Sequence, residues 1–213
     1  DIIETEITSP VPIELVANWT PLGPGILGSA GPSYIIRDFA GALINNTWYS
    51  AAIANMLAGI DLDANSHDIN ASFSSSFANW YFGTDGNTPA GQYDFVSVVL
   101  HELIHGLGFF GSMTVSSGQG RWGYDTGFPV VYDQYAVNGS DQRLLNTILF
   151  PNPSIALRNQ LTSNNIFFDG DSSVLGNGGT NPKLYTPATW SQGSSYSHWD
   201  ETTYPAGNIN SLM

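Results

Sequence analysis

The sequence predicts an α+β fold, with short strands and two helices in the N-terminal half and an irregular C-terminal half. Residues 68–77 alternate between apolar and polar side chains, as a half-exposed strand does. Apolar residues from Tyr49 to Ile60 recur at helical spacing, and a second apolar run, 95–100, leads into a motif with two histidines. After Gly108 no regular period continues, so only short elements are expected there.

The length and composition suit one domain. A chain of 213 residues with 42% hydrophobic residues can bury a sizeable core. No repeat or long linker interrupts it, so we expect a single domain over 1–213. It would form an N-terminal lobe over 1–108 and a C-terminal lobe over 109–213, with a cleft between them.

Two strands are expected before the first helix. Residues 11–18 alternate in the manner of a strand, and 34–37 is a second candidate. The Gly- and Pro-rich segment 21–32 between them predicts a loop. The first helix is expected to start at the capping pair Asn46-Thr47 and to end at Gly59.

The second helix is expected to follow a loop over 83–92. Asp94 stands where an N-cap would, with Ser97 three residues on. Further along, 153–163 predicts a short helix capped by Ser154. The Gly-, Asn- and Ser-rich stretch 170–181 predicts a surface loop.

The most informative segment is His101-Glu102-Leu103-Ile104-His105. Histidines four apart share one face of a helix, so both imidazoles can reach one metal ion. Glu102 lies close enough to act on a water that the metal activates. This is the H-E-x-x-H pattern of zinc peptidases, and a divalent cation would satisfy the buried polar groups of such a helix.

The glycines after the motif give further information. Gly106 and Gly108 would each cost about 1 kcal/mol against alanine inside a helix, so a helix continuing through them is disfavoured. Glycine at 108 favours an abrupt stop with a left-handed turn. The resulting pattern, H-E-x-x-H-x-x-G, opens the metzincin signature.

Zinc needs a third protein ligand. Three residues after Gly108 stands Gly111, which has no side chain to coordinate a metal. The two remaining histidines are His67, which is read as a surface residue in a polar turn, and His198. His198 is the stronger candidate because no other imidazole lies in the C-terminal half. An aspzincin-type ligand remains an alternative, and its candidates are Asp125 and Asp133.

The chain resembles the leishmanolysin-type metzincins, and a set of bacterial secreted proteins similar to them, over 46–111 and 183–213. The shared residues are those of the motif, Gly108-Phe109, His198-Trp199 and Leu212-Met213. In that family a long insertion separates the motif from the third histidine, and here His198 follows His105 by 198 − 105 = 93 residues.

This resemblance implies a metzincin-like fold, with a mixed twisted sheet, a backing helix and an active-site helix. It implies that Met213 forms the methionine turn beneath the metal, which would leave the chain cut off just after that turn. It also implies that an edge strand, either 68–77 or its neighbour, pairs with extended substrate.

The expected function is a zinc endopeptidase that hydrolyses peptide bonds of extracellular proteins. His101, His105 and His198 would bind one zinc ion, and Glu102 would be the general base. The alternative is a non-catalytic adhesin or binding module with a structural metal, which closed four-ligand coordination would identify. A glutamate inside the motif argues against that alternative, because a purely structural site does not need it.

Composition limits the partners. The net charge of −13 argues against nucleic acid and anionic membranes, and no apolar run is long enough to insert into a membrane. The absence of cysteine fits either a reducing compartment or a secreted bacterial protein, and the acidic, lysine-poor composition favours the second. The start at Asp1 suits a trimmed product. A monomer is expected, although the sequence does not define the oligomeric state. The pairs Asp61/Asp63 and Asp169/Asp171 are candidate calcium sites or simply solvated acidic loops.

Overall fold

The structure is a computed structural model, and it describes residues 7–208 and 210–213. It is a mixed α/β protein with several small sheets. The chain forms two compact units, each of which is described by itself. Of the described residues, the first unit contains 7–45, Tyr49–Phe109 and Leu212, and the second contains Asn46–Trp48, 110–208, 210–211 and Met213.

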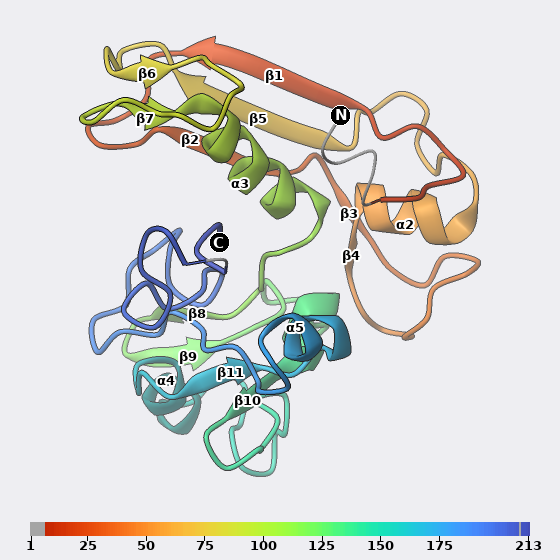
Figure 1. Cartoon of the computed structure of the whole chain (residues 1–213). Coiled ribbons are helices and arrows are strands. Elements are labelled where there is room, and N and C mark those ends of the chain that lie inside the picture. Colours follow the sequence, from red (N-terminus) through yellow and green to blue (C-terminus); the bar gives the residue numbers. More distant parts are fainter. Residues whose placement is uncertain (1–6, 209) are drawn as a thin grey trace. The chain divides into compact units, whose positions relative to one another are not determined.

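The largest sheet lies in the first unit and has three strands in the order β1-β5-β2 (Figure 1). Strand β1 (Leu15–Thr20) runs parallel to β5 (Ile69–Ser74), and β2 (Gly28–Pro32) runs antiparallel to it. The predicted alternation is confirmed over 69–73, where Ile69 and Phe73 are buried and Asn70 is exposed, but it fails at Ser74, which is buried and ends the strand before residue 77. Because β5 is the central strand, 68–77 is not the edge strand, and of the two expected options only its neighbour remains, since β1 and β2 form the edges of this sheet.

Strand β2 lies inside the segment 21–32, so the predicted loop is wrong for its last five residues. Its sequence, Gly-Ser-Ala-Gly-Pro, has no β-branched or aromatic residue that would signal a strand. The strand depends on its neighbours: it pairs with β5 and packs against helix α3. Small residues are needed there, because a Cβ at Gly28 would lie 2.8 Å from Cγ of Glu102.

Helix α2 spans Ala51–Ala58 and begins later than the expected pair Asn46-Thr47. Asn46 has a φ of 55°, which a right-handed helix does not allow. The intervening residues Tyr49–Ser50 form β4, which pairs antiparallel with β3 (Ile35–Ile36). The helix ends at Gly59 as predicted, with a φ of 69°.

Helix α3 spans Phe95–Leu107 and carries the histidine motif. It follows the short parallel pair β6 (Trp80–Tyr81) and β7 (Tyr93–Asp94). Asp94 is its N-cap, as predicted, because its carboxylate accepts from the Ser97 amide at 2.8 Å. Gly108 ends the helix, also as predicted, with a φ of 138° that favours glycine.

The face of α3 opposite its histidines borders an open groove. Val96, Leu103 and Leu107 belong to an apolar stripe that lines a groove of about 1460 Å³, and residues from Ile7 to Leu15 form another wall. With 3.6 residues per turn, the stripe lies about half a turn away from the histidines. The groove is therefore on the other side of the helix from the motif.

The second unit contains two antiparallel strand pairs and short helices. The pairs are β8 (Thr114–Ser116) with β9 (Gln119–Arg121), and β10 (Ala136–Asn138) with β11 (Ile166–Phe168). The helices are the 3-10 helix η1 (Val131–Tyr135), α4 (Ile155–Leu161) and α5 (Asp171–Gly176). The core of this unit is apolar and fully buried: Val130, Leu144, Leu157, Leu161, Ile166 and Leu184.

Two sequence predictions concern these helices. Helix α4 is confirmed together with its cap, because the Ser154 side chain accepts from the Leu157 amide at 2.9 Å. The predicted loop over 170–181 is wrong for Asp171–Gly176, which forms α5. None of the six residues of α5 is buried. A helix without a buried face needs no apolar stripe, and the sequence therefore carried no periodic signal for it.

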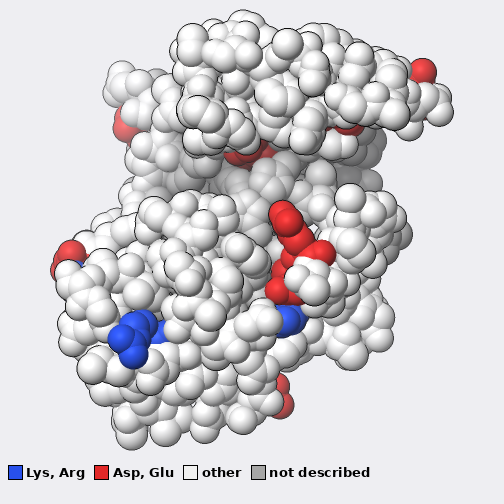
Figure 2. Space-filling view, turned by 90° about the vertical axis from the view of Figure 1, so that its left-hand side faces the viewer, with Lys and Arg blue, Asp and Glu red and all other residues white. Residues whose placement is uncertain are grey.

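Uncharged side chains cover most of the face drawn in Figure 2, and the few charged ones stand in small groups. This agrees with a chain in which 11% of residues are charged. Among the described residues, no helix has both the length and the apolar character needed to cross a membrane.

Candidate functional site

His101 and His105 lie on one face of α3, one turn apart. Their Nε2 atoms are 3.2 Å apart, and their rings are nearly perpendicular, at 87°. On the other side of each ring, Nδ1 meets a backbone carbonyl oxygen. Nδ1 of His101 is 2.5 Å from the oxygen of Leu212, and Nδ1 of His105 is 2.7 Å from the oxygen of Phe109.

These carbonyl contacts fix the tautomer of both rings. A carbonyl oxygen only accepts hydrogen bonds, so each Nδ1 carries the proton and each neutral ring has its lone pair on Nε2. Two such lone pairs at 3.2 Å repel one another unless a cation or an additional proton is shared between them. Two nitrogens bound tetrahedrally to zinc at 2.0–2.1 Å lie about 3.3 Å apart, so the pair fits that ion.

Glu102 points from α3 toward strand β2. Only 7% of the residue is exposed, and the Ala30 backbone amide donates a hydrogen bond to its carboxylate. Burial raises the pKa of Glu102 to about 7, and the bond from Ala30 offsets part of that rise. A carboxylate of this kind can both accept and release a proton near neutral pH.

His198 lies in the second unit, in a loop that begins at Ser194. Its Nδ1 is 2.8 Å from the Ser194 carbonyl oxygen, so here too the proton lies on Nδ1 and the lone pair on Nε2. Its own carbonyl accepts from the Tyr185 amide at 2.8 Å. The next residue, Trp199, donates its amide to the carbonyl of the buried Met213 at 3.0 Å. The histidine is thus held in the same tautomer as His101 and His105.

His67 has a different environment. It lies just before β5, where its Nε2 is 2.5 Å from Oδ1 of Asn70 in an exposed contact. That nitrogen contacts the side-chain amide of Asn70 at the surface, which agrees with the prediction that His67 is a surface residue.

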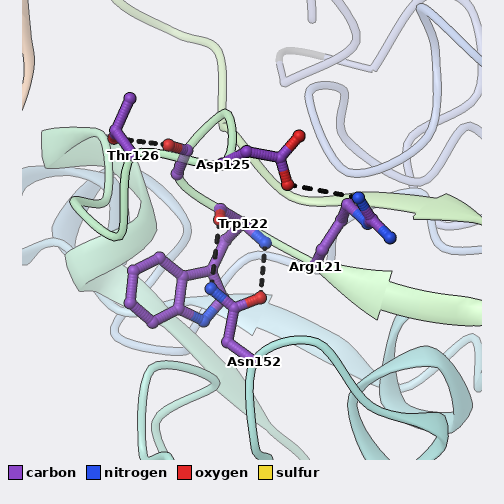
Figure 3. A network of polar contacts seen from close by, with 6 residues as sticks. Arg121, Trp122, Asp125, Thr126 and Asn152 are labelled. Atoms are coloured by element: carbon purple, nitrogen blue, oxygen red, sulfur yellow. Dashed lines mark hydrogen bonds and ion pairs between the residues drawn. The ribbon is translucent and has the colours of Figure 1, made fainter.

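The two aspartates considered as alternative ligands have other partners. Asp125 pairs with Arg121 at 3.1 Å (Figure 3). The side chain of Asp125 is 81% exposed. The same view shows Asn152 bonded to both the amide and the carbonyl of Trp122, at 3.1 Å each. Asp133 is fully buried and accepts from the amides of Ser112 and Val130. Both carboxylates therefore already have partners other than a metal ion: an arginine for Asp125 and backbone amides for Asp133.

The candidate calcium pairs are occupied by local hydrogen bonds and ion pairs. Asp61 accepts from the Asp63 amide at 3.0 Å, and Asp63 accepts from the Ser66 hydroxyl at 2.8 Å. Asp169 pairs with Arg143 at 2.5 Å. Within residues 7–208 and 210–213, none of these aspartates belongs to a group of three or more side chains that could hold a metal.

Some residues around the motif gave no functional signal in the sequence. Gly28 and Ala30 contact Glu102 from a strand that the sequence did not reveal. The carbonyl of Leu212 lies 111 positions from His101 in the chain. Every residue has a backbone carbonyl, so the sequence gives no sign of which one contacts the histidine. The one available signal was the small size of the residues in 28–31.

Comparison with known proteins gives a family match. A model of the SPBPB7E8-like family matches residues 34–168, which include α2, β5 and the whole of α3. No curated protein and no solved structure is significantly similar to the chain.

This match corrects the resemblance drawn from the sequence. The matching family is not a metzincin or leishmanolysin family, so the resemblance to leishmanolysin-type metzincins is wrong. The shared residues were few and scattered over short motifs, and a five-residue motif can recur in unrelated families. The role of Met213 in a methionine turn depended on that resemblance alone.

Proposed function

The chain belongs to the SPBPB7E8-like family, and from its own residues we propose that it is a zinc-dependent endopeptidase. In this proposal it cleaves extracellular polypeptides, with His101, His105 and His198 as metal ligands and Glu102 as general base. These three histidines are a group of side chains that could hold one metal ion.

One observation carries the proposal: the Nε2 atoms of His101 and His105 face each other at 3.2 Å, while each Nδ1 lies against a backbone carbonyl oxygen. The carbonyls of Leu212 and Phe109 hold the protons on Nδ1 and so keep both lone pairs directed at the same point. Histidine ligands in metal sites commonly donate their second nitrogen in this way, which fixes the ring and strengthens it as a ligand.

His198 is the proposed third ligand for the same reason. The bond from its Nδ1 to the Ser194 carbonyl matches the bonds made by the two motif histidines. Three neutral imidazoles suit zinc, and three protein ligands leave the fourth position open, as in catalytic rather than structural sites.

Zinc in this site would supply a Lewis acid that lowers the pKa of water and polarises the carbonyl of the bond to be cleaved. The remaining steps belong to Glu102. It takes a proton from the attacking water and later delivers it to the leaving amine. The Ala30 amide holds one face of the carboxylate, so the glutamate is oriented before substrate arrives.

The buried glutamate favours an enzyme over a binding module with a structural metal. Burying a carboxylate without a cationic partner lowers stability, and its raised pKa records that cost. A closed structural site gains nothing from such a group, whereas a general base needs it.

The test combines metal analysis with a cleavage assay on an unstructured protein such as casein. The purified chain should contain one zinc ion and cleave the substrate, and chelation should abolish cleavage. Glu102→Gln should retain zinc and lose at least about 1000-fold in rate, because the base is removed while the ligands stay. Full activity of this variant would refute the proposed mechanism.

The third ligand has its own matched pair of variants. His198→Ala should lower zinc occupancy and abolish cleavage, whereas His67→Ala should change neither. Equal zinc content in both variants would exclude His198 as a ligand.

A further inference from the structure

Tyr196, two residues before His198, has an unusual backbone. Its φ is 76°, in the left-handed region that residues other than glycine seldom adopt, and its side chain is fully buried. A left-handed residue bends the chain sharply, so its conformation sets the direction in which the following residues leave it. Such strain persists only where the surroundings hold it in place.

Three hydrogen bonds hold Tyr196. Its hydroxyl donates to Oδ1 of Asp133 at 3.1 Å, and its carbonyl accepts from the hydroxyl of Tyr132 at 2.9 Å. Its amide donates to the carbonyl of Tyr185 at 2.7 Å. The side chain and both backbone polar groups are therefore fixed.

Asp133 is the centre of this arrangement. Its carboxylate is fully buried and also accepts from the Val130 amide at 2.9 Å and from the Ser112 amide at 3.0 Å. The Ser112 hydroxyl donates to it as well. One carboxylate thus ties Tyr196 to two other segments of the second unit.

Gly111 makes room for the tyrosine. A Cβ at position 111 would overlap the ring of Tyr196 and would lie 2.9 Å from Oδ1 of Asp133. The Gly111 amide also donates to the hydroxyl of Ser197 at 3.2 Å. The same glycine therefore contacts two consecutive residues of the loop.

The loop is held again at His198. Tyr185, which accepts from the Tyr196 amide, donates its own amide to the His198 carbonyl at 2.8 Å. The backbone between Tyr196 and His198 is thus fixed at both ends by one residue. A change in the backbone at Tyr196 would move the imidazole.

We propose that Asp133, acting through Tyr196, is a positioning group for His198, and that it holds the loop 194–199 in the conformation in which His198 binds zinc. This inference rests on the proposed function. It gives the aspartate, one of the alternative ligands considered from the sequence, a role that involves no contact with the metal.

Tyr196→Phe is the leading variant, because it removes the bond to Asp133 and keeps the ring against Gly111. Zinc affinity, measured by competition with a chromogenic chelator, should fall about tenfold or more. Ser154→Ala is the matched control: it removes the capping bond of α4 in the same unit without touching the loop. It should lower the melting temperature and leave zinc affinity unchanged.

A double variant tests whether the effect passes through His198. Combining Tyr196→Phe with His198→Ala should weaken zinc binding no further than His198→Ala alone. Additive losses would overturn the inference, as would a Tyr196→Phe variant that binds zinc as tightly as Ser154→Ala does.

If Tyr196→Phe does not fold, Tyr132→Phe removes the bond to the Tyr196 carbonyl instead, with the same expected loss. These outcomes are distinct from failure of the proposed function. If His198→Ala weakens zinc binding and neither tyrosine variant does, only the positioning role is wrong. If His198→Ala has no effect, the assignment of the third ligand is wrong.

Discussion

Gly28 of strand β2 and Glu102 of helix α3 lie so close together that a single added methyl group would displace the glutamate. A Cβ at position 28 would lie 2.8 Å from both Cγ and Oε1 of Glu102. The strand that holds the glutamate through Ala30 therefore also limits where its side chain can go.

Gly28→Ala should lower kcat/KM about tenfold or more, because a general base displaced by an ångström loses much of its effect. The crowding should also lower the free energy of unfolding by about 1–3 kcal/mol. Gly31→Ala is the matched control on the same strand, since a Cβ at that position would meet no heavy atom within 4 Å. Cleavage rates and urea unfolding of both variants check this, and equal activities would contradict it.

Glu102 should make the metal-free protein less stable as pH rises. Burial raises its pKa from 4.5 to about 7, so between these values the folded protein keeps a proton that the unfolded chain has lost. Its contribution to stability is full below pH 4.5 and is lost as pH approaches 7.

Glu102→Gln removes this titration and keeps an oxygen that can accept from Ala30. In the chelated protein, the stability of the variant relative to wild type should increase between pH 4.5 and pH 8 by about 3 kcal/mol. Urea unfolding at both pH values measures this. A constant difference would mean that the carboxyl group does not titrate in this range.

Gly106 marks the closest approach of α3 to strand β5. A Cβ at this position would overlap Cγ2 of the buried Ile69. Gly106→Ala should therefore lower the free energy of unfolding by about 1–3 kcal/mol, although alanine is about 1 kcal/mol better than glycine in a helix.

Gly176→Ala, in the exposed helix α5, provides the comparison because nothing lies within 4 Å of its added Cβ. That variant should be unchanged or slightly more stable in thermal unfolding. A stabilised Gly106→Ala variant would show that the helix and β5 are packed less closely.

Asp125→Ala should leave zinc content and cleavage unchanged. The side chain of Asp125 is 81% exposed and pairs with Arg121 at the surface, so its loss should lower the free energy of unfolding by less than about 0.5 kcal/mol. Metal analysis of the purified variant checks this directly. Loss of zinc would restore Asp125 as a ligand candidate.

The sequence predicted the elements that have local signals. Helix α3 has a capping aspartate at one end and a glycine at the other, and α4 has its capping serine, so both were found with their ends nearly correct. Strand β2 was missed because its residues favour turns and it forms only by pairing with β5. Local propensity cannot report a partner that lies about 40 positions away.

The candidate site likewise contains residues that the sequence could predict and contacts that it could not. His101, Glu102 and His105 could be proposed from spacing alone, since one turn of a helix brings them to one place. The carbonyls that set the histidine tautomers could not be predicted, nor could the contact of Tyr196 with Gly111. These depend on residues brought together only by the folded chain.

The contact between Gly111 and Tyr196 has a consequence for how related sequences can vary. The two positions share one small volume, so neither can enlarge by itself. A relative with a larger residue at the position of Gly111 should carry a smaller one at the position of Tyr196, and should then have another means of holding its histidine loop. The two positions are expected to change together during evolution, although 85 residues separate them in the chain (196 − 111 = 85).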